Sequence, residues 1–298
     1  QAEDEKSLQS YLKRKSDVGT GDGTNDPKKR KKVYTINLDP AVRTVPYQCN
    51  IDIRDSVKYK DVMKQYNLGP NGAIMTCLNL FATRFDSVLN LVEKRADELE
   101  YILVDTPGQI EVFNWSASGT IILDSLAASL PVVVIYVIDT VRCERAVTFM
   151  SNMLHVCSVM YKTKLPFIAC FNKTDVVSHK ECLLWMENYD AFAEAVLKDG
   201  SYMASLSRSC GLALAEFYRS LRCAGVSSAT GKGFVELLTA ISEARNEYQT
   251  QYLPWLEHQK AKVLEKKEKE AKKDKLRLAK DVQNEADGSD DDDDDDED

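Results

Sequence analysis

The sequence is poor in the residues and patterns that mark zinc sites, disulfide frameworks and membrane spans. It has only three histidines, and its eight cysteines include no Cys-x-x-Cys pair. Cysteines scattered in this way argue against a zinc site or a disulfide scaffold and are typical of core residues in a reducing compartment. No apolar run approaches the ~18 residues that a spanning helix needs, and the first thirty residues are too charged for a signal peptide. We therefore expect no membrane association.

The net charge of −8 arises at one end of the chain. Ten of the 47 acidic residues lie in residues 287–298, so the rest of the chain carries 37 acidic against 39 basic residues. This nearly neutral body gives no general signal for direct nucleic-acid binding. A hydrophobic content of 44% in 298 residues provides a core for one large α/β domain with tails.

Composition divides the chain into four segments. Two basic clusters in the first segment, at 13–15 and 28–32, are separated by twelve residues, which resembles a two-part nuclear import signal. A solvated basic tail explains them equally well. The segments are a disordered polar and basic stretch, a folded domain, a charged helical extension and an acidic disordered tail, at 1–32, 33–256, 257–286 and 287–298.

The folded region is organised around residues 101–109 (Tyr-Ile-Leu-Val-Asp-Thr-Pro-Gly-Gln). The apolar run predicts a buried strand that ends at Asp105, where open α/β sheets place their ligands. A carboxylate there suits Mg²⁺, which prefers oxygen ligands and keeps several waters. Gly108 lets a backbone N–H approach a phosphate, and Gln109 is suited to orient an attacking water. The alternative is an ordinary strand and turn with a buried aspartate.

A second strand-and-loop unit carries the pattern Asn-Lys-Thr-Asp. Residues 166–171 are apolar and predict a buried strand, which delivers Asn172, Lys173 and Asp175. A carboxylate at the position of Asp175 can accept hydrogen bonds from N1–H and the N2 amino group of guanine, whereas adenine lacks this pair of donors. Asn172 can brace the neighbouring loop, and the stem of Lys173 can lie over the base. Directly after a buried strand, this motif is a strong signal for GTP.

Other segments hold weaker candidates. Residues 33–38 predict a strand that places Asp39 at its end, as a second carboxylate or as a simple turn residue. Gly69, Pro70 and Asn71 lie in a stiff loop at 68–72 between two expected helices. Asn71 could contact a phosphate or its water, but by composition alone a plain turn is the better explanation.

The C-terminal half of the folded region completes the predicted sheet. Ser227 and Ser228 lie in a loop of small residues suited to close over a base. Helices are expected at 57–67, 73–99, 146–161 and 234–252, and residues 180–222 are expected to be mostly helical. A further strand, buried on both faces, is expected at 131–140, and residues 225–231 are expected to form a short strand and the small-residue loop.

Taken together, the motifs resemble those of the GPN-loop GTPases over residues 33 to about 256. The matching sequences are Asn-Leu-Asp-Pro-Ala, Asn-Ile-Asp-Ile-Arg-Asp, Gly-Pro-Asn, Asp-Thr-Pro-Gly-Gln-Ile-Glu and Asn-Lys-Thr-Asp, at 37–41, 50–55, 69–71, 105–111 and 172–175. The resemblance implies an α/β, P-loop NTPase-like fold with a doubly wound, mostly parallel sheet, a helical insertion and a charged C-terminal helix.

The resemblance also implies an activity and a set of roles. The protein would be a dimeric GTPase that binds GTP or GDP with Mg²⁺. Asp39 and Asp105 would organise Mg²⁺ and the attacking water, and Gly108 and Gln109 would sense the γ-phosphate. The loop Gly69-Pro70-Asn71 would reach the nucleotide of the opposite subunit, so Asn71 would act in trans.

The cellular role implied by the resemblance is assembly and nuclear import of RNA polymerase II. The expected partners are a second GPN-loop GTPase, in a homodimer or heterodimer, and polymerase subunits or assembly factors. An import receptor could bind residues 28–32. The protein would then shuttle between cytoplasm and nucleus.

One departure from the family pattern matters. The family places a strand, a Walker A phosphate loop and a helix before the Asn-Leu-Asp-Pro segment, and residues 1–32 stand in that place here. The glycine-rich run at 19–24 lacks the Gly-x-x-x-x-Gly-Lys-Ser/Thr order. Without the strand, which is central in this fold, neighbouring strands would lose a partner and leave an apolar gap. Three functions remain open: a working GTPase, a scaffold or adaptor that binds nucleotide weakly, and an acidic-tailed nuclear interaction protein.

Overall fold

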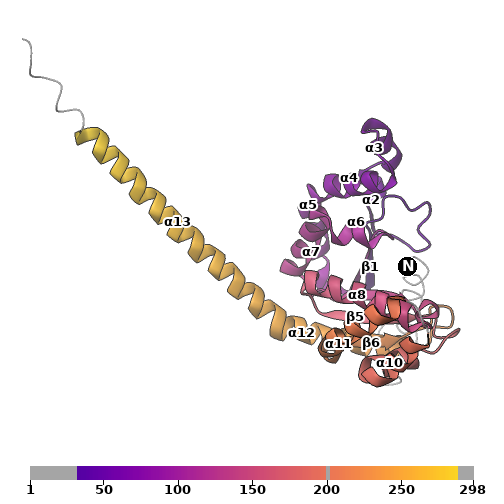
Figure 1. Cartoon of the computed structure of the whole chain (residues 1–298). Coiled ribbons are helices and arrows are strands. Elements are labelled where there is room, and N and C mark those ends of the chain that lie inside the picture. Colours follow the sequence, from indigo (N-terminus) through magenta and orange to yellow (C-terminus); the bar gives the residue numbers. More distant parts are fainter. Residues whose placement is uncertain (1–31, 199–201, 288–298) are drawn as a thin grey trace, which may run out of the picture. The chain divides into compact units, whose positions relative to one another are not determined.

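The computed structural model describes residues 32–198 and 202–287 (Figure 1). Expectations for the basic clusters, the glycine-rich run and the acidic tail therefore fall outside the described residues, except that Lys32 opens the first strand. The chain divides into two compact units, one ending at Tyr248 and one beginning at Gln249. Each unit is described separately below.

The first unit is an α/β structure with parallel strands, as predicted. Among the described residues the strands form two three-stranded sheets, in the orders β2-β1-β3 and β4-β5-β6. The strands are β1 (Lys32–Asn37), β2 (Ile51–Asp52), β3 (Leu99–Asp105), β4 (Val134–Asp139), β5 (Phe167–Asn172) and β6 (Arg222–Gly225).

Register brings the carboxyl ends of the strands together within each sheet. In the first sheet Asn37 pairs with Asp105, and in the second Asp139 pairs with Asn172. No ladder joins β3 to β4 in the described part of the chain. Side chains of both sheets instead share an apolar cluster in which Leu103 packs with Ile168 and its neighbours. The fold is thus parallel α/β, with its sheet in two parts where the sequence predicts one.

Burial differs sharply between the strands of the second sheet. All six residues of β5 are buried. In β4 only Ile138 is buried, and Val137 is 37% exposed. The expectation that residues 131–140 form a strand buried on both faces is therefore wrong, because β4 is shorter and is an edge strand of its sheet.

Helices pack around both sheets (Figure 1). Those of the first unit include α2 (Ile53–Ser56), α3 (Tyr59–Gln65), α4 (Pro70–Ala82), α5 (Phe85–Glu93), α6 (Ile110–Asn114), α7 (Ala117–Ser129), α8 (Ala146–Thr163), α9 (Lys180–Glu187), α10 (Tyr189–Leu197), α11 (Tyr202–Ser220) and α12 (Phe234–Glu247). Three short elements lie between longer ones in the chain: η1 (Ala96–Glu98) between α5 and β3, η2 (Thr140–Cys143) between β4 and α8, and η3 (Tyr248–Tyr252) after α12.

Two local expectations need correction near the start of α4. Residues 68–72 are not one stiff loop, because Pro70 is already in the first turn of α4 and Gly69 is its N-cap. Proline suits this position, since its fixed φ is helical and its missing N–H would have no helical partner. The single helix expected at 73–99 is broken after Ala82, where the Thr83 hydroxyl donates to the Leu80 carbonyl at 2.7 Å.

Each sheet has its own apolar core. Under the second sheet, the rings of Phe149, Trp185 and Phe192 pack against one another with centroids 5.3 to 6.4 Å apart. Beside the first sheet, Phe81 and Phe85 meet edge to face at 6.1 Å within a separate cluster. These two cores hold the strand ends on which the candidate site is built.

The second unit contains one long helix, α13 (Leu253–Asp287). Its side chains described up to residue 273 are mostly exposed, and i,i+4 pairs such as Lys269–Glu265 run along it. In the described part of the chain, no helix combines the length and the apolar character that a membrane span requires.

Candidate functional site

The loops that follow β5 and β6 are joined through the side chain of Asn172. Asn172 is only 4% exposed, and its Oδ1 accepts from the Lys173 backbone N–H at 2.7 Å. The same oxygen accepts from the backbone N–H and the hydroxyl of Ser228, both at 3.1 Å. A single buried amide oxygen therefore fixes two loops against each other, as the sequence predicts for this asparagine.

Asp175 is held by Ser227, the residue before Ser228. The Ser227 hydroxyl donates to Asp175 Oδ1 at 2.6 Å. This hydrogen bond is the main cause that holds the pKa of Asp175 below its ordinary value. The carboxylate itself is exposed, so it is both ionised and accessible to a ligand.

The loop after β6 is a tight hairpin built on glycine. Ser227 and Lys232 form an antiparallel bridge, and the Ser227 hydroxyl also accepts from the Thr230 backbone N–H at 3.2 Å. Gly231 and Gly233 have φ angles of 75° and 80°, which favour glycine. A Cβ on Gly233 would also collide with the backbone before the hairpin, whereas one on Gly231 would meet open space.

Lys173 is fixed by a residue that the sequence reasoning missed. Its backbone is left-handed, with φ of 66°, and its Nζ donates to Asp139 Oδ2 at 2.9 Å. Next to Asp139, the Thr140 hydroxyl donates to the Asn172 backbone carbonyl at 2.6 Å. The sequence does contain one indication of this role, because Asp139 is the last residue of an apolar strand, as Asp105 is. The structure sets it opposite Asn172 in the ladder.

Asp39 and Asp105 lie at the carboxyl ends of the neighbouring strands β1 and β3. The Leu38 backbone N–H donates to the Asp105 carbonyl at 2.8 Å, which continues the ladder past β1. Asp39 Oδ1 accepts from the Ala41 backbone N–H at 2.9 Å, so this carboxylate also shapes a turn. The hydroxyl of Tyr47 donates to Asp105 Oδ2 at 2.8 Å.

The loop from Asp39 to the start of β2 is tied down at both ends. At one end the Arg54 guanidinium donates to the carbonyls of Val42 and Arg43, at 3.3 and 3.2 Å. Arg54 also forms a salt bridge with Asp52 at 2.6 Å. Partial burial acts to raise the pKa of Asp52, but hydrogen bonds, first that from Arg54, bring it below its ordinary value.

The other end of this loop is tied to β1. The Thr35 hydroxyl donates to the Gln48 carbonyl at 2.6 Å, and the Thr35 backbone N–H donates to Asn50 Oδ1 at 2.9 Å. Tyr47 is therefore adjacent to an anchored residue, whereas the exposed residues Arg43 and Thr44 lie earlier in the loop.

The residues at this edge fit a magnesium ion of the kind that accompanies nucleotides. Mg²⁺ prefers carboxylate and phosphate oxygens, keeps several waters, and needs only one or two protein carboxylates. Asp39 and Asp105 supply that donor chemistry at the ends of paired strands. A dedicated cage of three or more acidic, histidine or cysteine side chains is not found among the described residues.

The remaining predicted residues are exposed and are not brought into this cluster. Gly108 and Gln109 lie in the bend before α6, and Gln109 is the N-cap residue of that helix, without a side-chain cap. Gly69 and Pro70 open α4, and Asn71 follows at its second position, facing solvent. Within the described residues, the Asn71 side chain makes no hydrogen bond. Its predicted role in trans stays a prediction.

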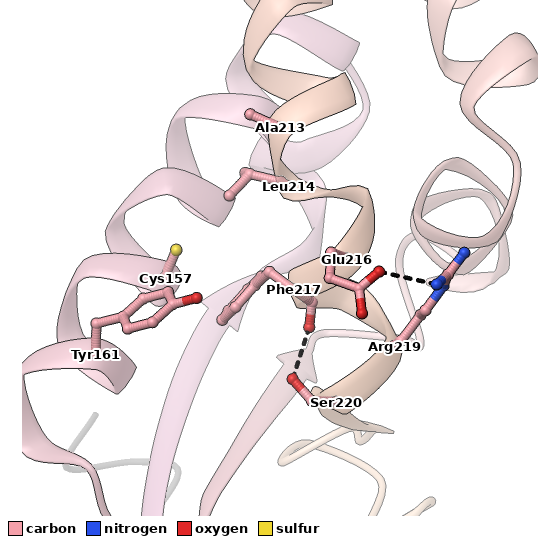
Figure 2. Close-up of a pocket in the computed structure, with 8 residues that line it drawn as sticks. All are labelled: Cys157, Tyr161, Ala213, Leu214, Glu216, Phe217, Arg219 and Ser220. Atoms are coloured by element: carbon pink, nitrogen blue, oxygen red, sulfur yellow. Dashed lines mark hydrogen bonds and ion pairs between the residues drawn. The ribbon is translucent and has the colours of Figure 1, made fainter.

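A surface pocket of about 470 Å³ lies elsewhere, between α8 and α11 (Figure 2). Tyr161 and Phe217 stack across it with ring centroids 6.2 Å apart, and Glu216 pairs with Arg219 at its rim. None of the predicted site residues lines this pocket. The candidate site is therefore defined by the strand ends rather than by this pocket.

Comparison with known proteins identifies the family. A family model described as "Conserved hypothetical ATP binding protein" matches residues 25–247. GPN-loop GTPase 1 of Schizosaccharomyces pombe is 48% identical over 271 residues, which cover 88% of this chain and 74% of the relative. The chain belongs to the GPN-loop GTPase family. GPN-loop GTPase QQT2 of Arabidopsis thaliana is 56% identical over 228 residues, covering 76% of this chain and 60% of the relative.

Two further comparisons concern the share of each relative that the chain covers and the fold that they have in common. GPN-loop GTPase 1 of Dictyostelium discoideum is 52% identical over 250 residues, or 84% of this chain and 63% of the relative. The chain thus spans less than two thirds of the length of some of these GPN-loop GTPases. PAB0955, a GTPase from Pyrococcus abyssi solved in its apo form, aligns with a TM-score of 0.65 at 24% identity. The alignment covers 80% of this chain and 91% of PAB0955, and it establishes the shared fold.

Proposed function

We propose that the protein binds GTP and hydrolyses it to GDP with the help of Mg²⁺. The observation that carries the proposal is the cluster after β5 and β6, where the Asn172 amide and the Asp175 carboxylate are each fixed by a serine of the opposite loop. An exposed, ionised carboxylate on such a rigid mount matches the two donors on the edge of guanine. Membership of the GPN-loop GTPase family supports the same activity.

The chain's own residues divide the work between the two groups of strand ends. Asp175 accepts from guanine, Asn172 keeps the two loops in register, and the Lys173 stem covers the base. At the other strand ends, Asp39 and Asp105 would hold Mg²⁺ and its waters, and Mg²⁺ when bound would offset phosphate charge. Gly108 and Gln109 would sense the γ-phosphate, and Gln109 would orient the attacking water.

We further propose a dimer, in which the loop Gly69-Pro70-Asn71 contributes to the nucleotide site of its partner, either a second copy or another GPN-loop GTPase. The exposure of Asn71 at the start of α4 supports this, because the side chain is available to a second molecule. GTP and GDP states would then differ in dimer geometry, and client proteins would read that difference.

The cellular role that we propose is assembly and nuclear import of RNA polymerase II, with the protein shuttling between cytoplasm and nucleus. Its support is the resemblance of the motifs to the family and the basic cluster at 28–32, which is suited to an import receptor. Co-purification with polymerase subunits that depends on GTP tests the role. Unchanged nuclear entry after neutralising 28–32 would exclude that cluster as the import signal.

The decisive experiment exchanges the acceptor on Asp175 for a donor. In the Asp175→Asn variant, the amide should reject guanine and favour xanthine, whose exocyclic oxygen accepts a hydrogen bond. We expect GTP to bind roughly 100-fold more weakly than to the wild type and XTP to bind more tightly, as measured by calorimetry with Mg²⁺. Unchanged preference for GTP over XTP would remove the assignment. Asp190→Asn, an exposed change on α10, is the matched control.

One observation favours a second candidate, a scaffold or adaptor that binds nucleotide weakly. Among the described residues the sheet is divided, with no ladder between β3 and β4, and a divided sheet is what loss of the family's central first strand would leave. Calorimetry of the wild-type chain with a non-hydrolysable GTP analogue separates the two. Micromolar binding that is lost in Asp175→Ala supports the GTPase, and a folded protein without binding supports the scaffold.

A further inference from the structure

Tyr47 is a polar residue that touches the candidate metal carboxylate from a distant part of the chain. Its hydroxyl donates to Asp105 Oδ2 at 2.8 Å, across 58 positions of sequence. The loop that carries Tyr47 begins at Asp39, the other candidate metal ligand. One hydrogen bond therefore links the segment holding the first carboxylate to the second carboxylate.

The loop that carries Tyr47 is anchored on both sides of this residue. One residue beyond it, the Gln48 carbonyl accepts a hydrogen bond from the Thr35 hydroxyl at 2.6 Å. Tyr47 is therefore adjacent to a backbone group that is anchored to β1. Between Tyr47 and the Arg54 clamp on Arg43 lie only Thr44, which is exposed, and two half-buried residues. Loss of the phenol bond would remove the hydrogen bond that joins this part of the loop to the Asp105 side chain.

We propose that Tyr47 is a positioning residue that couples closure of the loop 39–50 to the orientation of the Asp105 carboxylate. The inference rests on the proposed function, because it assigns Asp105 to Mg²⁺. Groups that hydrogen bond to a metal-ligating carboxylate fix its direction, and their removal typically weakens metal binding 10- to 100-fold. Tyr47 would thus set the strength with which Mg²⁺ supports nucleotide binding, without touching the nucleotide itself.

A protease experiment tests the coupling without any ligand. Trypsin cuts after the exposed Arg43, and cleavage of a native loop follows the population of its open form. Because the lost hydrogen bond is one to a charged group, which is the stronger kind, Tyr47→Phe should be cut at this bond about tenfold faster than the wild type. Tyr59→Phe is the matched control, because it removes a hydroxyl that makes only a weak, exposed contact at 3.4 Å to the Pro70 carbonyl.

A double-variant cycle shows whether the two residues act through one bond. Asp105→Ala should also speed cleavage after Arg43, and the double variant should be cut no faster than the faster single variant. The proposal would be overturned if the two rate increases multiplied in the double variant. It would also be overturned if Tyr47→Phe were cut at the wild-type rate. If Asp105→Ala does not fold, Asp105→Asn takes its place, with a smaller effect expected because the amide oxygen still accepts.

The metal assignment has its own measurement. Calorimetric binding of GTP to Tyr47→Phe should weaken about tenfold with Mg²⁺ present and stay at the wild-type value in EDTA. Equal weakening in both conditions, or tighter binding with Mg²⁺, would overturn the positioning role. If the wild-type chain does not bind GTP, the proposed function and the metal role fail together, whereas the protease result still decides whether Tyr47 ties the loop to Asp105.

Discussion

The carboxyl ends of β5 and β6 differ in construction from those of β1 and β3. After β5 and β6, Asn172 and Ser227 are almost fully buried and the polar groups bond to one another across two loops. After β1 and β3, the buried Asn37 side chain holds Asp39 only by its backbone. The Asp39 carboxylate bonds within its own turn, and the Asp105 carboxylate is reached by the Tyr47 hydroxyl of a long loop. Gln109, four residues after Asp105 in the chain, is exposed.

This difference indicates how a ligand would meet each region. A network that is buried and internally bonded keeps its shape without a ligand, so the loops after β5 and β6 are preorganised and would lose little entropy on binding the proposed guanine. A loop held by a few bonds can adopt a second position when charge arrives. If the proposed function holds, base recognition would belong to the rigid part of the molecule, and phosphate and metal sensing to the adjustable part.

The largest effect is expected from distorting the rigid part at Gly233. Gly233→Ala adds a Cβ that collides with the Gly225 carbonyl at a φ of 80°, which should lower the free energy of unfolding by about 3 kcal/mol. Gly231→Ala, with φ of 75° and open space around it, should lose about 1 kcal/mol. Urea denaturation measures both. Equal losses would mean that contact with the preceding backbone contributes nothing.

Removing the amide that joins the two loops should have the next largest effect. Asn172→Ala leaves the Lys173 N–H and both Ser228 donors without their acceptor, at a cost of about 2 kcal/mol in the free energy of unfolding. Guanine binding should fall as well. The matched control on the adjustable side is Gln109→Ala, which should stay within about 0.5 kcal/mol. A similar loss for both variants would erase the proposed contrast.

A smaller effect concerns the ionisation of Asp175. Because the Ser227 hydrogen bond holds the pKa of Asp175 below its ordinary value, Asp175 stays ionised to unusually low pH. Any stability from this bond is present above the unfolded-state pKa and is lost as pH falls through the folded-state pKa. Ser227→Ala should therefore raise that pKa, as measured by carboxyl NMR titration, and move the acid loss of GTP binding to higher pH. Ser228→Ala is the control, and an equal shift there would contradict the assignment.

The smallest effect is expected where the two charges are exposed. Asp139→Asn weakens the salt bridge to Lys173, whose side chain is 53% exposed, so the free energy of unfolding should change by less than about 1 kcal/mol. GTP affinity should fall by only about threefold, because the Lys173 side chain loses its salt bridge while its backbone N–H stays bonded to Asn172. Binding measured at low and high salt checks this, and a large loss in both would show that Asp139 belongs to the rigid network.

Sequence reasoning identifies residues whose role follows from local order. Asn172 and Asp175 directly follow a buried strand, so motif and placement agree before the structure is known. Asp139 and Tyr47 carry no such motif, and their partners lie 34 and 58 positions away, so only the folded ladder and loop bring them into contact. Non-local pairing of this kind leaves no periodic signal in the chain.

The errors in secondary structure have physical causes as well. An apolar run shows that residues near 131–140 avoid water, but it does not show how many neighbouring strands cover them, and β4 proves to be an edge strand. Near Gly69, proline reads as a breaker whether it interrupts a helix or begins one. The structure shows the second case.

The helix α13 has a practical consequence for weighing the protein in solution. At 1.5 Å per residue, its 35 residues form a rod about 52 Å long, with largely exposed side chains over its first twenty residues. A rod of this length has more hydrodynamic drag than a compact segment of equal mass, so elution from a sizing column is a poor measure of whether the 33.6 kDa chain is single or paired. Light scattering or sedimentation equilibrium, which report mass independently of drag, would distinguish a pair from a single chain.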